Sequence, residues 1–274
     1  LYEANKLTGL FVSSGATLQV KESNGSLRLW GDLRAKQVWK KPLAVMVDRY
    51  SASASEIFAG AIQDYKRGII IGQKTFGKGT VQKLDDLSSG QIKITESKFY
   101  RVTGSGMQSK GINPDITLPS TWDIEEFGES SFETALPWDE IEPINYKKFS
   151  MQSSLISQLN DKHSIRVDKN PNLQYILDVR KRYEIQKNKK IISLNLTKRR
   201  VEKDERQTWA LDVENKRRSS LNLEIFNSYK DMEDYNDSKE TEEEEKDFEI
   251  DIDNDYLLNE GTQILSDYAM FNQS

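Results

Sequence analysis

Apolar and polar positions in the first half of the chain predict a strand, a helix and a second strand in succession. Residues 43–47 and 69–71 are apolar runs of the kind that a strand buried on both faces requires. Between them, residues 53–67 place their apolar side chains on one helical face: Ile57, Phe58, Ala61, Ile62 and Tyr65. Ser53 and Glu56 have the spacing of a capping box at the start of this helix. Strands connected in this way lie parallel, in a right-handed crossover.

The N-terminal region predicts a helix end followed by a hairpin. Residues 1–11 have a helical pattern whose inward positions are expected to be Leu7, Leu10 and Phe11. Residues 17–22 and 26–30 alternate between apolar and polar side chains around Asn24-Gly25, a strong hairpin signal. We expect this hairpin at the periphery of the sheet. A further strand region is expected over 91–102, and Ile116 and Leu118 close the α/β part.

Beyond residue 119 the pattern becomes helical and polar. Helices are expected over 150–160, 172–186, 197–217 and 256–271, with a short strand over 191–196. Residues 231–255 are dominated by acids and are expected to be disordered or loosely held. The predicted fold is therefore an α/β segment over 1–119 and a mainly helical C-terminal domain over 120–274.

Composition excludes several kinds of chemistry. The net charge is −5, and acids interleave with the helix that follows the basic cluster at 181–200, so we expect a solvated face or a surface that contacts missing domains there, and no nucleic-acid partner. The absence of cysteine excludes disulfides and thiol catalysis. The single histidine, His163, lies in a polar helical region, where a surface role is expected, and zinc sites built from several His or Cys are impossible. Asp251, Asp253 and Asp255 lack the glycine turn and distal glutamate of a calcium loop.

A serine cluster and a lysine follow the two predicted parallel strands. Ser51, Ser53 and Ser55 come just after the first strand, and Lys78 lies in the loop after the second, so both belong at the same edge of the sheet. A lysine activates a serine only when it is neutral, which requires lowering its pKa from about 10.4 to near 7, roughly 4 to 5 kcal/mol. Lys78 stands between two glycines with no acid between Asp64 and Asp85. These residues taken alone leave open a plain helix cap and a solvated loop lysine.

Longer stretches decide between these alternatives by resemblance. The chain resembles the C-terminal processing (tail-specific) protease family, serine proteases with a Ser/Lys dyad, through DRYSASASEIFAGAIQDY, TFGKGTVQ, KFYRV, KGINPDITLP, ALPWD and IISLN. The resemblance implies a crotonase-like or Clp-protease-like α/β core. It places the nucleophile at Ser53, the general base at Lys78, and a glutamine that holds the lysine at Gln82. The Ala54 N–H would be one oxyanion donor, and Asp64 matches an acidic position for which we expect a structural role, such as an ion pair with Lys66, Arg67 or a loop.

The same resemblance sets wider expectations. It implies an endopeptidase acting near the C-termini of proteins with apolar tails, in the bacterial periplasm, with neither metal nor nucleotide as cofactor. Helical-repeat lipoprotein adaptors serve some family members. The chain shows no transmembrane stretch or signal peptide and begins without Met, which we interpret as a fragment lacking the PDZ domain and a glycine that supplies a second oxyanion donor. Two alternatives remain: a non-catalytic scaffold or substrate-binding paralogue, and a crotonase-fold enzyme acting on thioesters.

Overall fold

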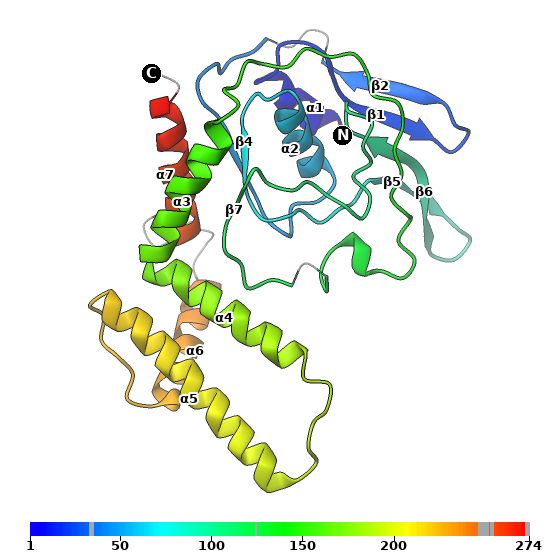
Figure 1. Ribbon diagram of the computed structural model, residues 1–274. Coiled ribbons are helices and arrows are strands. Elements are labelled where there is room, and N and C mark those ends of the chain that lie inside the picture. The colour runs from blue at the N-terminus through cyan, green and yellow to red at the C-terminus, as the bar shows by residue number, and fades with distance from the viewer. Residues whose placement is uncertain (33–35, 124, 246–251, 253–254, 272–274) are drawn as a thin grey trace. The chain divides into compact units, whose positions relative to one another are not determined.

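The chain forms two compact units. The computed structural model describes residues 1–32, 36–123, 125–245, 252 and 255–271. One unit comprises Leu1–Leu118, Trp122–Asp161 and Gly261–Ser274, and the other comprises Pro119–Thr121 and Lys162–Glu260 (Figure 1). The first unit is α/β and the second is helical, which confirms the predicted fold class.

A parallel sheet carries the predicted strand, helix and strand. Its order is β3-β4-β7, with β3 at Ala44–Val47, β4 at Ile69–Gly72 and β7 at Ile116–Thr117. Helix α2, Ala54–Asp64, connects β3 to β4, and both strand pairs are parallel as expected. Gly72 ends β4 at φ 126°, where a Cβ atom would lie 1.9 Å from the Val47 carbonyl oxygen. Only glycine can therefore bring the two strand ends this close.

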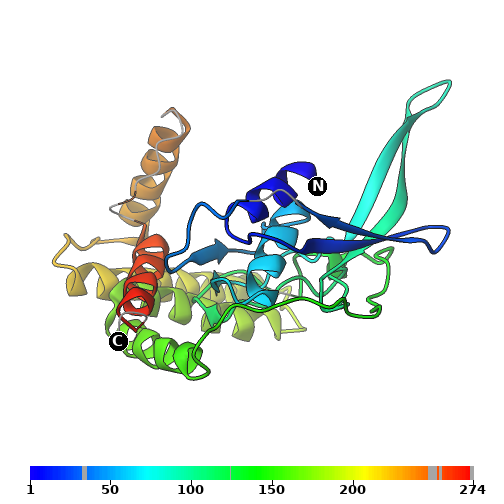
Figure 2. The same cartoon turned by 90° about the horizontal axis from the view of Figure 1, so that it is seen from above.

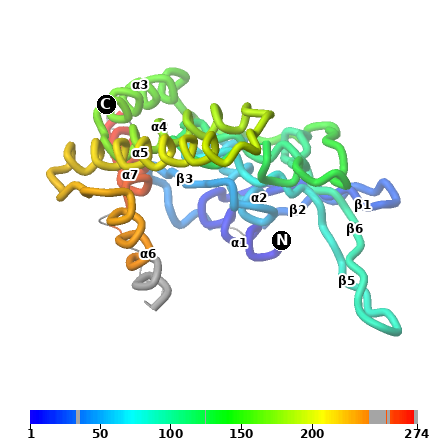
Figure 3. Tube along the Cα trace, turned by 90° about the horizontal axis from the view of Figure 1, so that it is seen from below, coloured from blue at the N-terminus to red at the C-terminus, as the bar shows by residue number. Residues whose placement is uncertain are grey.

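A second, antiparallel sheet has the order β2-β1-β6-β5. Strands β1, Ala16–Glu22, and β2, Leu27–Gly31, form the hairpin predicted at Asn24-Gly25, with β2 at the sheet edge. Strands β5, Thr80–Asp86, and β6, Gln91–Tyr100, form a longer hairpin that extends from the rest of its unit (Figures 2 and 3). Strand β5 begins two residues after Lys78, so this sheet continues directly from the lysine loop.

The core of the first unit lies between α2 and the two sheets. Its fully buried members include Leu18, Ile57, Ile62, Ile70 and Phe99. Helix α1, Tyr2–Gly9, turns Ala4, Asn5, Thr8 and Gly9 inward. The expected inward positions were therefore partly wrong: Leu7 and Leu10 are 43% and 41% exposed, whereas Phe11 packs against the core.

Residues 122–161 pack in the same unit as the α/β part, although we expected the helical domain to begin at 120. They include the short 3₁₀ helix η1, Glu129–Ser131. Three backbone hydrogen bonds fasten the later portion: Gly106 N to Asp139 O, Ile141 N to Gly104 O and Ile144 N to Val102 O. The Trp138 indole also donates to Gly106 O at 2.9 Å. The attachment therefore combines backbone hydrogen bonds with the Trp138 side chain and with Ile144, Tyr146 and Phe149, which pack against the core.

The second unit consists of helices. The helical elements of the C-terminal region are α3, Leu155–Lys169; α4, Pro171–Lys187; α5, Leu196–Ser220; α6, Tyr229–Glu245; and α7, Tyr256–Phe271. The part of α3 up to Asp161 and the part of α7 from Gly261 belong to the first unit. The expected strand at 191–196 is absent from the described residues, since 191–195 are irregular and α5 begins at Leu196. Residues 231–245, expected to be disordered, form most of α6, whose start is held by buried Met232 and by contact of the Tyr235 and Phe226 rings. Residues 246–251, 253 and 254 lie outside the described part.

Candidate functional site

Ser53 occupies a strained turn between β3 and α2. Its backbone has φ 56° and ψ −109°, a region that residues other than glycine rarely adopt. A serine on a sharp turn from strand to helix is the arrangement of a nucleophile elbow, which exposes the hydroxyl above the sheet edge. The strain therefore singles out Ser53 within the serine cluster.

Hydrogen bonding separates the three serines further. The Ser51 hydroxyl donates to Asp48 Oδ1 at 2.9 Å and accepts from Asp48 N at 3.1 Å. The Ser55 hydroxyl donates to Ala52 O at 2.8 Å. Within the described part of the chain, the Ser53 hydroxyl donates to no residue. Among the three serines, Ser53 is therefore the one whose hydroxyl proton has no described acceptor.

Glu56 joins the serine turn to the lysine loop. Its side chain is fully buried, and Oε2 accepts the backbone N–H of Ser53 and of Lys78, each at 2.8 Å. Oε1 accepts Gly77 N at 2.7 Å and the Thr75 hydroxyl at 2.5 Å. Burial raises the pKa of Glu56, and these four hydrogen bonds oppose the rise. The sequence indicated only a capping residue here, because the loop partners lie about twenty positions away.

The lysine loop has a partner for every backbone N–H from Thr75 to Gly79. Thr75 N donates to Ile112 O at 3.1 Å and Phe76 N to Ser51 O at 3.0 Å. Gly77 and Lys78 donate to Glu56, and Gly79 N donates to Gln108 Oε1 at 2.8 Å. The backbone that carries Lys78 is therefore held at each residue. Lys78 is half-buried, and its side-chain amino group forms no ion pair with any described residue.

Two further expected site residues differ in how the structure places them. Ala54 is the first residue of α2, and its N–H has no hydrogen-bond partner among the residues described. This N–H is therefore a donor available at the N-terminus of the helix. Gln82 lies exposed on β5, opposite Thr95. No hydrogen bond joins its amide to Lys78 in the described part of the structure, so its role in holding the lysine stays a prediction.

Asp64 lies at the far end of α2 from Ser53. It is buried and accepts from Arg101 Nε at 2.9 Å and Arg101 Nη2 at 2.5 Å. Burial raises the pKa of Asp64, and Arg101 opposes the rise. The partner is thus Arg101, in the loop after β6, and not Arg67, which donates to the carbonyl groups of Phe11, Trp39 and Lys41.

His163 is not a surface residue as expected. It is buried within the helical unit, with Nδ1 2.8 Å from Glu260 Oε1, and Arg166 Nε donates to the same oxygen at 2.9 Å. Burial tends to raise the pKa of Glu260, but hydrogen bonds from His163 and Arg166 outweigh it and hold that pKa below its ordinary value. The surroundings of His163 are those of a structural ion cluster, far along the chain from the serine.

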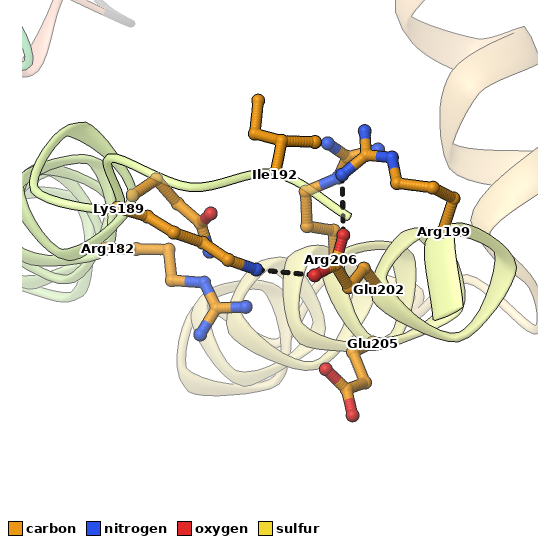
Figure 4. A pocket seen from close by; sticks show the side chains of 8 residues that line it. Arg182, Lys189, Ile192, Arg199, Glu202, Glu205 and Arg206 are labelled. Atoms are coloured by element: carbon orange, nitrogen blue, oxygen red, sulfur yellow. Dashed lines mark hydrogen bonds and ion pairs between the residues drawn. The ribbon is translucent and has the colours of Figure 1, made fainter. Parts of the chain in front are cut away.

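The basic cluster at 181–200 borders a cavity of about 140 Å³ between α4 and α5 (Figure 4). Glu202 lies between two of its cations, 2.6 Å from Lys189 and 2.5 Å from Arg199, as the dashed lines in Figure 4 show. Paired charges of this kind are typical of a solvated face. Among the described residues, no group of acids and histidine could hold a metal ion, and no helix is long and apolar enough to cross a membrane. Asp251 and Asp253 lie outside the described part.

Two family models match consecutive parts of the chain. Residues 1–118 match the model described as peptidase family S41, and residues 122–270 match the model described as the C-terminal domain of tail specific protease (DUF3340). The two matches together span both the serine and lysine region and the helical unit.

Individual proteins are also similar to the chain. The chain is 37% identical over 284 residues to the tail-specific protease of Haemophilus influenzae, covering 99% of this chain and 39% of the relative. It is 37% identical over 124 residues to the carboxy-terminal-processing protease of Bartonella bacilliformis, covering 43% of this chain and 28% of the relative. The solved photosystem II D1 C-terminal processing protease is 35% identical, with a TM-score of 0.39, covering 43% of this chain and 31% of that one. The chain thus spans about two fifths of the length of the Haemophilus influenzae protein.

Proposed function

Because this chain belongs to the tail-specific protease family, we propose that it carries the Ser/Lys dyad of an endopeptidase that cleaves proteins near their C-termini. The observation that carries the proposal is the shared carboxylate of Glu56. Its Oε2 atom accepts from the backbone of both Ser53 and Lys78, so the two residues are anchored side by side on one oxygen.

The proposed reaction uses only groups of this site. Neutral Lys78 removes the proton from the Ser53 hydroxyl while Oγ attacks the scissile carbonyl carbon. The Ala54 N–H donates to the carbonyl oxygen as it gains negative charge, assisted by the N-terminus of α2. The resulting ammonium of Lys78 returns the proton to the leaving amine, and an acyl-enzyme forms. Water then attacks the acyl carbon while Lys78 takes its proton. As the bond between that carbon and Ser53 Oγ breaks, Lys78 passes the proton to Oγ, which releases the peptide acid and restores Ser53.

Three features support this assignment. The Ser53 turn is strained, its hydroxyl has no described acceptor, and Lys78 is free of ion pairs with described residues. The described donors to the nearby Glu56 carboxylate are three backbone N–H groups and the Thr75 hydroxyl, and the Lys78 amino group is not among them.

The decisive experiment compares single variants of the intact protein that contains this chain. Ser53→Ala and Lys78→Ala should each abolish cleavage of an unfolded protein with an apolar C-terminal tail. Ser55→Ala is the matched control, because it removes a neighbouring hydroxyl already bonded to Ala52, and it should retain cleavage. A serine-reactive acylating probe should label the native protein and Ser55→Ala, but not Ser53→Ala.

The same probe tests the alternatives. A non-catalytic scaffold or a substrate-binding paralogue would leave Ser53 unlabelled while a tail peptide still bound. A thioester hydrolase would turn over an acyl thioester and spare the protein substrate. Normal cleavage by Ser53→Ala or Lys78→Ala would refute the dyad itself.

The proposal extends to substrates, location and partners. We infer that substrates carry apolar C-terminal tails, that the protein acts in the periplasm, and that a helical-repeat lipoprotein adaptor is a candidate partner. The similarity to a Gram-negative tail-specific protease supports the location. Fractionation of cells by osmotic shock would test the periplasmic location. If the protein appeared only together with cytoplasmic marker proteins, that location would be contradicted. Replacing the apolar tail of the substrate by a charged one should slow cleavage.

A further inference from the structure

Gln108 contacts the lysine loop and is nearly inaccessible to solvent. Its side chain is 2% exposed, and Oε1 accepts the Gly79 N–H at 2.8 Å. The backbone on either side also lies against the loop: Ser109 N donates to Gly77 O at 2.7 Å, and a Cβ atom on Gly79 would lie 2.3 Å from Gln108 N. Gly79 is therefore required for this close approach, and the Gln108 amide satisfies the last N–H of the loop.

Glu129 holds both Gln108 and the other end of the loop. The second polar atom of the amide, Gln108 Nε2, donates to Glu129 Oε1 at 2.8 Å. The Glu129 backbone N–H donates to Phe76 O at 2.9 Å. Phe76 and Gly79 flank Lys78, so Glu129 and Gln108 complete a ring of hydrogen bonds around the residue that we propose as the base.

A second side chain, Arg49, also connects the residues around Glu129 to the lysine loop. Arg49, whose side chain is fully buried, donates to Phe127 O at 2.5 Å and also to Thr75 O. Phe127 and Glu129 both belong to the stretch matched by the tail specific protease C-terminal model, whereas the lysine loop belongs to the stretch matched by peptidase family S41. The start of the C-terminal region thus contacts the lysine loop through two independent side chains.

We propose that Gln108 and Glu129 are positioning residues for Lys78, a role that rests on the proposed Ser/Lys function. Neither residue need touch substrate. The physical reason is that displacing a catalytic group by about 1 Å can slow turnover about 100-fold. The C-terminal region would therefore supply part of the geometry on which proton transfer depends.

The geometry of the amide suggests a set of variants of the intact protein. Glu129→Ala removes the acceptor of Gln108 Nε2, whereas Glu129→Gln keeps an acceptor oxygen. Gln108→Glu keeps the acceptor for Gly79 N–H but sets two carboxylates against each other. The double variant Gln108→Glu with Glu129→Gln restores both hydrogen bonds with the charges exchanged. Glu133→Ala, at an exposed position in the same segment, is the matched control.

The measurement is the acylation rate per active site, with the number of competent sites determined by titration with the serine-reactive probe. We expect Glu129→Ala and Gln108→Glu to lower this rate at least tenfold with KM changed less than about threefold. Glu129→Gln and Glu133→Ala should stay within about threefold of the native rate, and the double variant should recover most of the loss of Gln108→Glu. In Glu129→Ala, the pH at half-maximal rate should also move, because the surroundings of the lysine amine change.

Two results would overturn the inference. A native rate per titrated site and an unchanged pH profile in Glu129→Ala and Gln108→Glu would show that these residues only stabilise the fold. Failure of the double variant to recover activity, although it folds, would show that the hydrogen bonds are not what matters. An unlabelled, inactive native protein would instead refute the proposed function, so the two failures are distinguishable.

Discussion

The backbone N–H groups of Ser53 and Lys78 donate to the same oxygen atom, Oε2 of the buried Glu56, each at 2.8 Å. One carboxylate thus fixes the distance between the two residues proposed to exchange a proton. A buried acceptor with two backbone donors can be replaced only by a group that presents the same lone pairs.

Glu56→Gln should therefore damage both stability and activity. The amide can offer one acceptor oxygen, but its NH₂ group would face backbone donors in place of the second oxygen. We expect a loss of about 2 to 4 kcal/mol in the free energy of unfolding and roughly 100-fold in turnover per folded molecule. Urea unfolding and probe titration measure the two effects separately. Glu96→Gln, at an exposed position on β6, should change neither. Native turnover in Glu56→Gln would rule out its positioning role.

Asp64→Asn should act through stability. The substitution leaves the guanidinium of Arg101 partly buried without its carboxylate, which we expect to cost about 3 kcal/mol of unfolding free energy. The labelling rate of the remaining folded protein should stay native, because Asp64 lies about 16 Å from Ser53 along the helix. Asp85→Asn, which breaks an exposed pair with Lys83, serves as the control. A slow labelling rate at full folded fraction would assign Asp64 a part in the reaction.

Glu260 should make the helical unit sensitive to acid. Its pKa is held below the ordinary value of 4.5 in the folded state, so the unfolded chain takes up the proton first as the pH falls. The stabilisation is present above pH 4.5 and is lost as the pH drops through the lower, folded pKa. Glu260→Gln should destabilise the protein at pH 7 and narrow the difference in unfolding temperature between pH 7 and pH 3.5. Calorimetry of both proteins, with exposed Glu205→Gln as the control, measures this change. If the unfolding temperature of Glu260→Gln fell as much between pH 7 and pH 3.5 as that of the native protein, protonation of Glu260 would not account for the acid sensitivity.

The pattern of side chains along the chain was enough to predict the local elements near the site. Apolar runs and a helical face between them predicted β3, α2 and β4, because each element must bury its own apolar positions. Asn24-Gly25 predicted the first hairpin for a similarly local reason, the backbone conformation that its turn requires. The pattern predicted less well which face of a helix is buried. Leu7 and Leu10 were expected inward and are exposed, because packing against α2, and not hydrophobicity alone, sets the rotation of α1.

The acidic stretch shows a second limit of prediction from the sequence. Residues 231–245 form a helix despite a composition typical of disorder, and the contacts that hold its start involve Arg218 and Phe226 from outside the stretch. His163 was likewise expected at the surface and is buried, because its partner Glu260 lies 97 residues away. In both cases the deciding contact is distant in sequence.

The sequence by itself determined the order of strands and helix, the sheet edge where the serine turn and the lysine loop lie, and, through its motifs, the family. The family resemblance had already pointed to Ser53, and the tertiary structure adds a physical distinction from Ser51 and Ser55: backbone strain at Ser53 and hydrogen bonds that occupy the other two hydroxyls. Only the tertiary structure brought Glu56, Gln108 and Glu129 to the lysine loop. The physical reason is that periodicity records which side chains a single element buries, whereas a polar side chain satisfies whichever donors the folded chain places beside it, at any separation along the sequence.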